Sequence, residues 1–120
     1  MKKMSRIEID ALPEFEKDLK QLLKRYRTLN EDLAVLGKVL NEEPNDCPPF
    51  SYRIEGLGIK TCIVKVRKIA CKELKGRGAQ SGLRLICAYF KEEGRIIFIE
   101  LYHKNDQENE DRERILRHFT

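Results

Sequence analysis

The sequence predicts a single α+β domain in which an N-terminal helical hairpin packs on a small, mainly antiparallel twisted sheet. Two observations lead to this prediction: two apolar stripes of helical period come first, and three strand-like segments joined by short connections follow. The length of 120 residues suits one domain over residues 1–120, with a single core. Hydrophobic residues make up 41% and charged residues 37%, which excludes a disordered polyelectrolyte.

The first elements are a short strand and two helices. Apolar and charged residues alternate in RIEI at 6–9, as in a strand, and Pro13 then suits the first position of a helix. That helix carries one apolar stripe, formed by Phe15, Leu19, Leu22, Leu23 and Tyr26. The tetrapeptide T-L-N-E predicts a second helix start, with Thr28 and Glu31 as a capping box. This second helix should end before Pro44.

The rest of the chain is predicted as a loop, three strands and a tail. Residues 41–58 hold the remaining prolines and two glycines, so we expect a loop there. Three β-branched or alternating segments follow, at 61–70, 81–90 and 95–104, and KEEG joins the last two as a hairpin. Residues 105–120 are expected to be a polar tail with a short helix, DRERILRHF, whose apolar side carries Ile115, Leu116 and Phe119.

Side chains alternate faces along a strand, so each strand has a predicted apolar face. The helices are expected to cover Cys62, Val64, Val66, Leu83, Leu85, Cys87, Tyr89, Ile97, Ile99 and Leu101. The opposite face collects Phe98 and six polar residues, namely Lys65, Arg67, Arg84, Glu100, Tyr102 and Lys104. A half-buried sheet has a wet face in any case, and wet faces carry charge. Like charges on neighbouring strands cost stability, however, so this cluster also suits a phosphate-bearing ligand.

Charge is unevenly distributed along the chain. The net charge is +4, but residues 60–95 hold ten Lys or Arg against three Glu, a local charge of +7 that attracts polyanions. Glycines in the loop KELKGRGAQSG fit neither GxxxxGK[ST] nor GxGxxG, and a strand follows them, which argues against a nucleotide-cradling loop. The loop is either an ordinary connection or a basic flap that contacts a nucleic-acid backbone through Lys68, Lys72, Lys75 and Arg77.

Cysteine usage and hydropathy indicate an intracellular setting. The four cysteines form no CxxC pair, and with two histidines neither a zinc site nor another cofactor is expected. Cys62 and Cys87 lie in apolar strand patterns, where a cysteine acts as a small hydrophobe. No apolar run approaches the ~18 residues of a membrane span. The start MKKMSRIEID lacks the pattern of a signal peptide, so we expect a cytoplasmic protein without a membrane partner.

Several segments together resemble a known family. The succession of helical hairpin, VKVRKIA, basic glycine-rich loop, SGLRLICAYF and IIFIELYHKND resembles the RelE/ParE superfamily of toxins from bacterial toxin–antitoxin pairs. The resemblance covers about residues 6–105. It is closest to the HigB-like members, whose loop is similar to GKGKSGGxR and whose last strand ends in YxK. The resemblance implies a RelE-like fold and an mRNA interferase, an endoribonuclease that cleaves mRNA in the ribosomal A site. It also implies a cognate antitoxin that silences the toxin in a hetero-oligomer.

The resemblance places catalytic groups, by position, at Lys65, Arg67, Arg84, Tyr102 and Lys104. Metal-free RNA cleavage uses the 2′-hydroxyl as nucleophile, so a base must take its proton and cations must stabilise the phosphorane. Arg84 and Arg67 suit the second task, because a guanidinium binds phosphate through two donors. Tyr102 is the expected base, its pKa lowered by nearby cations. Lys65 is the competing base, and Lys104 is expected to protonate the leaving 5′-oxygen.

Two residues and two alternative functions stay open. Parity points His103 toward the helices, and only a bulge at the strand end would bring it to the basic face, where some relatives use a histidine. Glu100 either orients a cation or competes for one. One alternative function is that of a ParE-like toxin, which binds DNA gyrase without catalysis and generally lacks the full set of basic residues and tyrosine. The other is that of a non-catalytic nucleic-acid-binding module.

Overall fold

The computed structural model describes residues 7–45, 48–74 and 81–119. Within them the elements are, in chain order, β1 (Glu8–Ala11), α1 (Pro13–Leu23), α2 (Leu29–Glu42), β2 (Ser51–Arg53), β3 (Cys62–Val66), β4 (Leu83–Phe90), the 3-10 turn η1 (Lys91–Glu93), β5 (Arg95–His103) and α3 (Arg112–Phe119). The strands form one sheet in the order β1-β5-β4-β3-β2, in which β1 pairs with β5 in parallel and the other three pairings are antiparallel. The predicted α+β fold with a mainly antiparallel sheet is confirmed.

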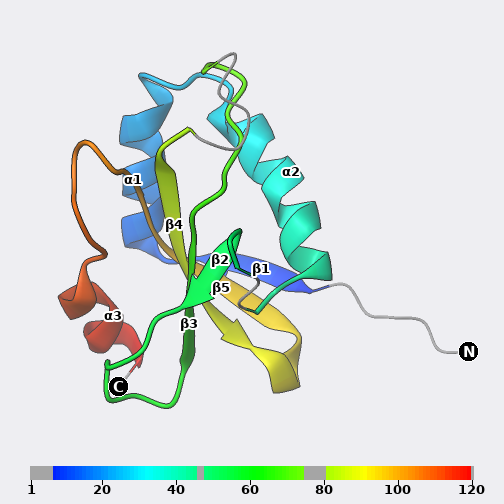
Figure 1. Cartoon of the computed structure of the whole chain (residues 1–120), viewed down its shortest axis with the longest axis vertical. Coiled ribbons are helices and arrows are strands. Elements are labelled where there is room, and N and C mark those ends of the chain that lie inside the picture. Colours follow the sequence, from blue (N-terminus) through cyan, green and yellow to red (C-terminus); the bar gives the residue numbers. More distant parts are fainter. Residues whose placement is uncertain (1–6, 46–47, 75–80, 120) are drawn as a thin grey trace, which may run out of the picture.

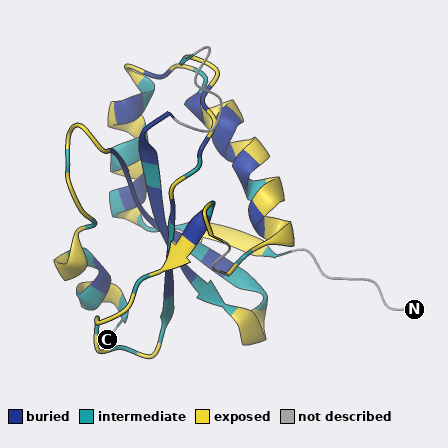
Figure 2. Ribbon diagram, in the orientation of Figure 1, coloured by how far each residue is buried: buried dark blue, intermediate teal, exposed yellow. Residues whose placement is uncertain are grey.

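The helical hairpin supplies the larger core. Phe15 and Leu22 of α1 and the leucines of α2 pack on the sheet against Val64, Leu85 and Phe98. Figure 1 shows the hairpin at the top of the molecule and α3 at the lower left, with the sheet between them. Buried stripes run along α1 and α2 on the sides that meet the sheet (Figure 2). Each fully buried side chain of this size contributes about 1.5–3 kcal/mol, so this layer dominates the stability of the fold.

The start of α2 is not capped as the sequence predicts. Thr28 occupies the N-cap position but makes no side-chain capping bond, so the predicted capping box is wrong. Its hydroxyl instead donates to the carboxylate of Asp32 at 2.9 Å and accepts the backbone N–H of Glu73 at 3.1 Å. Glu31 pairs with Lys72 at 3.2 Å rather than with the cap. The cause is tertiary: the chain after β3 packs on this helix end and occupies the groups that a capping box would use.

A short strand was missed within the predicted loop at 41–58. The three residues of β2 pair antiparallel with β3, with Tyr52 opposite Lys65 and Arg53 opposite Val64. Three residues are too few to show a clear alternating pattern, and neighbouring prolines and glycines mask it. The strand forms one edge of the sheet.

One irregularity in β5 changes which residues face the helices. Ile86 of β4 lies opposite Glu100, whereas the next residue, Cys87, lies opposite Phe98. Ile99 is therefore an extra residue, and the pair contains a β-bulge. A bulge shifts the alternation of side chains by one residue along the strand that carries it.

The bulge makes part of the predicted parity wrong. Up to and including the bulge residue, the faces are the reverse of the prediction: Phe98 packs in the hairpin core, while Ile97 and Ile99 lie on the opposite face. After the bulge, Leu101 packs under the hairpin and Tyr102 lies on the opposite face, as predicted. The error is confined to the part of β5 that ends with the bulge residue.

The second sheet face is also less open than predicted. The helix α3 packs there and completes a smaller core, formed by Ile63, Ile86, Ala88, Ile99, Tyr102 and Ile115. The sequence did not predict where the short helix of the tail packs, and the structure places it over the part of this face that lies next to β5. No helix among residues 7–45, 48–74 and 81–119 is long and apolar enough to cross a membrane.

Candidate functional site

Cross-strand register brings the basic residues together on the face opposite the hairpin. Tyr52 lies beside Lys65, which lies beside Ile86, and these three form one row across β2, β3 and β4. In the next row Arg84 lies opposite Tyr102. Residues that are paired across strands, or two apart along a strand, share a face. Arg67, two residues beyond Lys65, and Lys104, two beyond Tyr102, therefore extend this cluster.

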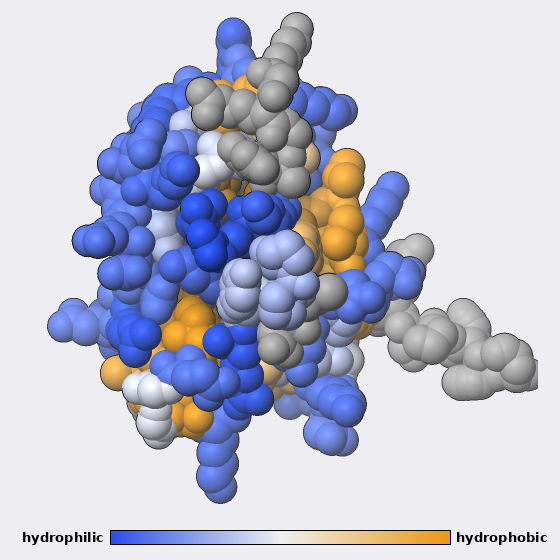
Figure 3. All heavy atoms as spheres, viewed as in Figure 1, coloured by the Kyte–Doolittle hydropathy of each residue, from blue (hydrophilic) through white to orange (hydrophobic). Residues whose placement is uncertain are grey.

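These side chains line a pocket of about 450 Å³, which we call the basic pocket. Its walls are formed by Tyr52, Arg53, Ile54, Glu55, Lys65, Arg67, Arg84, Lys104, Glu108, Asn109 and Arg112. Four of the five predicted catalytic residues are among them, and Tyr102 is the exception. In the space-filling view, strongly hydrophilic side chains gather at the middle of this face, in front of β3 and β4 (Figure 3).

Arg84 is held by backbone carbonyls. Its Nη1 donates to the carbonyl of Arg67 at 3.3 Å and to that of Leu83 at 3.2 Å. Burial, followed by the nearby charge of Arg67, lowers the pKa of Arg84, and Tyr102 opposes this shift. Two guanidinium groups close enough to affect each other are stabilised by an anion between them, which favours binding of a phosphate at this point.

Tyr102 lies beneath the pocket rather than in its wall. The residue is 5% exposed, and its hydroxyl has no hydrogen-bond partner among the residues that the structure describes. Burial raises the pKa of Tyr102, and this effect outweighs the lowering caused by Lys65, whose Nζ lies 6.0 Å from the ring centroid. The nearby cation acts in the expected direction, but the expected net lowering of the Tyr102 pKa is wrong for this conformation, because desolvation of the phenolate is the larger effect.

The chain after β5 covers Tyr102. We call residues 105–119 the C-terminal segment. The carboxylate of Glu110, with a side chain only 7% exposed, lies 3.2 Å from Lys65 Nζ and 3.2 Å from Arg112 Nη2. Burial raises the pKa of Glu110, but its own backbone amide, Lys65 and Arg112 together hold that pKa below the usual value. An internal anion thus occupies Lys65, one of the predicted catalytic cations.

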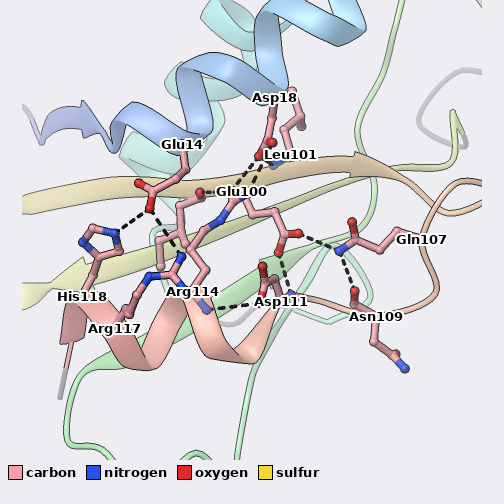
Figure 4. Close-up of polar contacts among 11 residues, drawn as sticks. Glu14, Asp18, Glu100, Leu101, Gln107, Asn109, Asp111, Arg114, Arg117 and His118 are labelled. Carbon is pink, nitrogen blue, oxygen red and sulfur yellow. Dashed lines mark hydrogen bonds and ion pairs between the residues drawn. The ribbon is translucent and has the colours of Figure 1, made fainter.

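Glu100 anchors the C-terminal segment. It accepts the backbone N–H of Asp111 at 2.8 Å and the side-chain amide of Gln107 at 2.6 Å (Figure 4). Burial raises the pKa of Glu100, and the two hydrogen bonds lower it by less. Two roles were left open for Glu100, orienting a cation or competing for one. Neither describes these hydrogen bonds, which go to the C-terminal segment.

Arg114 and Asp18 fasten α3 to the hairpin. The last pair between β1 and β5 is Ala11 opposite Phe98, but β5 continues to His103. Beyond Phe98, the backbone N–H and C=O groups on the β1 side of β5 therefore have no neighbouring strand to bond to. Arg114 Nη1 donates to the carbonyl of Ile99 at 2.8 Å and to Asp18 at 2.8 Å. Asp18 also accepts the N–H of Leu101 at 3.1 Å (Figure 4). The ion pair therefore satisfies backbone groups beside the bulge as well as joining α3 to α1.

Comparison with known proteins identifies this architecture. No family model matches the sequence, and no curated protein matches it. Among solved structures, a chain of the archaeal RelE–RelB complex from Pyrococcus horikoshii OT3 superposes with a TM-score of 0.58 at 15% identity, covering 86% of this chain and 100% of that one. A double-arginine mutant of the E. coli toxin RelE in the free state superposes with a TM-score of 0.54 at 19% identity, covering 87% of this chain and 90% of that one. The fold is RelE-like. A metal-bound toxin from Helicobacter pylori superposes with a TM-score of 0.53 at 19% identity, covering 83% of this chain and 97% of that one.

In this RelE-like fold, His103 lies on the hairpin side of the sheet. It is 8% exposed, and its ring stacks on Tyr26 with centroids 6.1 Å apart. Its Nδ1 accepts the N–H of Asn105 at 3.0 Å, so Nε2 carries the proton and donates to the carbonyl of Ser81 at 3.0 Å. The bulge occurs four residues before His103 and does not turn it to the basic face.

The residues predicted to contact a nucleic-acid backbone are dispersed. Lys72 is exposed but pairs with Glu31 at the start of α2, outside the basic pocket. Lys68 is partly buried and does not line the pocket. Lys75 and Arg77 lie outside the described residues. The basic flap therefore stays a prediction.

Sequence reasoning missed the other seven residues of the pocket wall, as well as the carboxylate that pairs with Lys65. Tyr52 and Arg53 lay within the predicted loop, where the only local signal for a strand is the short alternation SYRI, which the neighbouring prolines and glycines mask. Arg112 reaches the pocket wall, and Glu110 reaches Lys65, only through the fold of the C-terminal segment, for which the sequence offers no local signal.

Two features of the fold lie apart from this chemistry. A larger hollow of about 930 Å³ lies between β1, α1 and α2, with a mainly apolar floor that includes Phe15, Leu33 and Phe98. Cys87 is fully buried, and burial raises the pKa of its thiol to about 12, so it is an inert core residue.

Within the described parts of the chain, no group of three or more His, Cys, Asp or Glu side chains is arranged to hold a metal ion.

Proposed function

We propose that this protein is the toxin of a toxin–antitoxin pair and acts as a ribosome-dependent mRNA endoribonuclease. The observation that carries the proposal is the basic pocket, in which Lys65, Arg67, Arg84 and Lys104 converge on one face of a RelE-like sheet. The archaeal neighbour is a RelE–RelB complex, which supports an antitoxin as the protein partner, in a hetero-oligomer. The ribosome and mRNA are proposed as further partners, and the cytoplasm as the location.

The proposed chemistry is attack of a 2′-hydroxyl on the adjacent phosphate. The 2′-oxygen loses its proton to a base and bonds to phosphorus, and the 5′-oxygen leaves and takes up a proton, giving a 2′,3′-cyclic phosphate and a 5′-hydroxyl end. Arg67 and Arg84 stabilise the charge that builds on the phosphorane oxygens. Lys104, exposed at the rim, protonates the leaving oxygen. Side chains can supply each of these groups, so the proposed reaction needs no metal.

Two side chains compete for the role of base. Tyr102 has the right position in the row beside Arg84, but it is buried with a raised pKa. Lys65 lines the pocket and is held by Glu110 at 3.2 Å. Either base becomes available only when the C-terminal segment moves away. We therefore propose that the described conformation is a resting state, and that displacement of this segment precedes cleavage.

The buried position of Tyr102 also fits a second candidate function, that of a non-catalytic module that binds nucleic acid through the open basic pocket. Such a module needs Lys65, Arg67 and Arg84 as phosphate ligands but has no use for Tyr102. A gyrase-binding toxin without catalysis would need neither the phosphate ligands of the basic pocket nor Tyr102. The dependence of activity on Tyr102 and Arg84 therefore separates the three functions.

The test is inducible expression with primer extension on a reporter mRNA. We expect wild type to produce transcript cuts within the reading frame, and Arg84→Ala to reduce them by at least about 100-fold, since one transition-state donor is worth about 2.7–4 kcal/mol. Tyr102→Phe, which keeps the ring in the core, should abolish cuts if Tyr102 is the base and leave them if Lys65 is. Lys91→Ala, on the distant and exposed η1, is the matched control and should cut like wild type.

Growth arrest by wild type without any cuts in the transcript would contradict the ribonuclease. Purified protein that binds RNA without cleaving it on the ribosome would indicate the binding module. Relief of the growth arrest by a gyrase variant would indicate the ParE-like function.

A further inference from the structure

One aromatic side chain in the basic pocket is unused by the chemistry above. Tyr52 lies on the edge strand β2 and is 37% exposed, although most large apolar side chains of the sheet are buried. It shares a face with its cross-strand partner Lys65, and its ring lies 5.6 Å from the Arg67 guanidinium carbon. The pocket therefore has cations on its floor and an accessible aromatic ring in its wall.

This combination matches the two parts of a nucleotide. Cations bind the phosphate, and an aromatic ring offers a surface on which a base stacks. Stacking needs an unpaired base, because the bases of a duplex already stack on each other. A phosphorylated protein side chain or inorganic phosphate would use Arg67 and Arg84 but would make no use of Tyr52.

We propose that Tyr52 is the base-stacking residue of the basic pocket, and that the pocket binds single-stranded RNA with one base on Tyr52 and the adjoining phosphate on Arg67 and Arg84. This inference deepens the proposed function, since it rests on RNA as the ligand, but it does not depend on cleavage. Tyr52 is a substrate-positioning residue: it fixes where the strand lies relative to Arg84.

A simpler role for Tyr52 is to hold Arg67 in place by their cation–π contact. The two roles differ in what they require of the ligand. Stacking depends on a base, whereas placement of Arg67 affects any phosphate chain equally. An oligomer that keeps the sugar–phosphate chain and lacks bases therefore distinguishes them.

The experiment measures binding of the full chain to two fluorescent oligomers by anisotropy. One is a short single-stranded 2′-O-methyl RNA, which the proposed reaction cannot cleave, and the other is its abasic counterpart. We expect Tyr52→Leu to weaken binding of the first by roughly 5- to 100-fold and to leave binding of the second unchanged, as stacking is worth about 1–3 kcal/mol per base. Tyr52→Phe keeps the ring and should bind both oligomers like wild type.

Two comparison variants set the scale. Arg67→Ala should weaken binding of both oligomers to the same extent and reduce the salt dependence by about one phosphate contact. Lys91→Ala should leave both unchanged. Thermal unfolding of each variant checks that the loss does not come from misfolding.

Equal loss for the two oligomers in Tyr52→Leu would overturn the proposal in favour of Arg67 placement, and so would no loss for either. Failure of wild type to bind the 2′-O-methyl RNA would overturn both this inference and RNA as the ligand. Base-dependent binding through Tyr52 without transcript cuts in the expression assay would uphold the inference and contradict only the proposed cleavage.

Discussion

At the residue scale, Gly82 and His103 show how the start of β4 is built. Gly82 has a φ of +90°, and a Cβ added there would lie 2.7 Å from His103 Nε2. The imidazole cannot easily retreat, because it bonds to Ser81 and Asn105 and stacks on Tyr26. The absence of a side chain at Gly82, two residues before Arg84, thus leaves room for the His103 ring to pack against the start of β4.

Replacement of this glycine is expected to be costly. Gly82→Ala combines an unfavourable backbone conformation with a steric clash and should lower the free energy of unfolding by about 2–3 kcal/mol. Gly58→Ala is the matched control, since Gly58 also has a positive φ, +73°, but open space around its Cβ. It should cost only about 1 kcal/mol. Urea unfolding of both variants gives the comparison, and equal losses would show that the His103 contact carries no energetic weight.

At the element scale, the C-terminal segment is both a structural layer and a cover. Ile115 fills the second core, while Glu110 neutralises Lys65 at the edge of the basic pocket. The same segment lends Arg112 and Asn109 to the pocket wall. Its position therefore determines how much positive charge a ligand meets there.

Removing the carboxylate of Glu110 should make the pocket more attractive to RNA. We expect Glu110→Gln to tighten binding of the 2′-O-methyl RNA by about 3- to 10-fold, because Lys65 is freed and one negative charge is lost. Glu113→Gln removes the same charge from an exposed position on the first turn of α3 and is the control. A gain of the same size in both variants would mean that only net charge matters, and would contradict a covering role for Glu110.

At the scale of the whole molecule, α3 joins the beginning and the end of the described chain. Arg114 pairs with Asp18 at 2.8 Å, and Glu14 bonds to His118 at 3.0 Å. The hydrogen bond from His118 is the main reason why the pKa of Glu14 falls to about 2. Two carboxylates with lowered pKa, Glu14 and Glu110, therefore help to hold the C-terminal segment in place.

Acid is expected to loosen this segment. Because the folded-state pKa of Glu14 lies below its ordinary value of 4.5, its contribution is complete above about pH 4.5 and is lost as the pH falls toward 2. Glu110 acts in the same direction and Glu100, with its raised pKa, in the opposite one. The protection factor of the Ile115 amide, which corrects for the intrinsic pH dependence of hydrogen exchange, should fall across this range. Glu14→Gln should reduce the pH dependence and Glu16→Gln should not; a profile unchanged by Glu14→Gln would contradict the explanation.

Local patterns predicted the parts of this molecule that local forces determine. The stripe from Phe15 to Leu22 and the alternation of β3 and β4 gave the hairpin, the sheet and the shared face of Lys65, Arg67 and Arg84. The bulge at Ile99 could not be predicted, because its backbone groups are satisfied by Asp18 and Arg114, 96 residues apart. The C-terminal segment over Tyr102 is held by the same distant contact, so the raised pKa of Tyr102 could not be predicted from the sequence either.

The span between Asp18 and Arg114 also has a consequence for the order of events during synthesis. The hairpin and every strand of the basic face precede α3 in the chain, and Asp18 is made 96 residues before Arg114. The ion pair that holds the C-terminal segment can therefore form only after all the strands of the basic face have been synthesised. Docking of α3 is thus the last of these contacts to become possible as the chain is made.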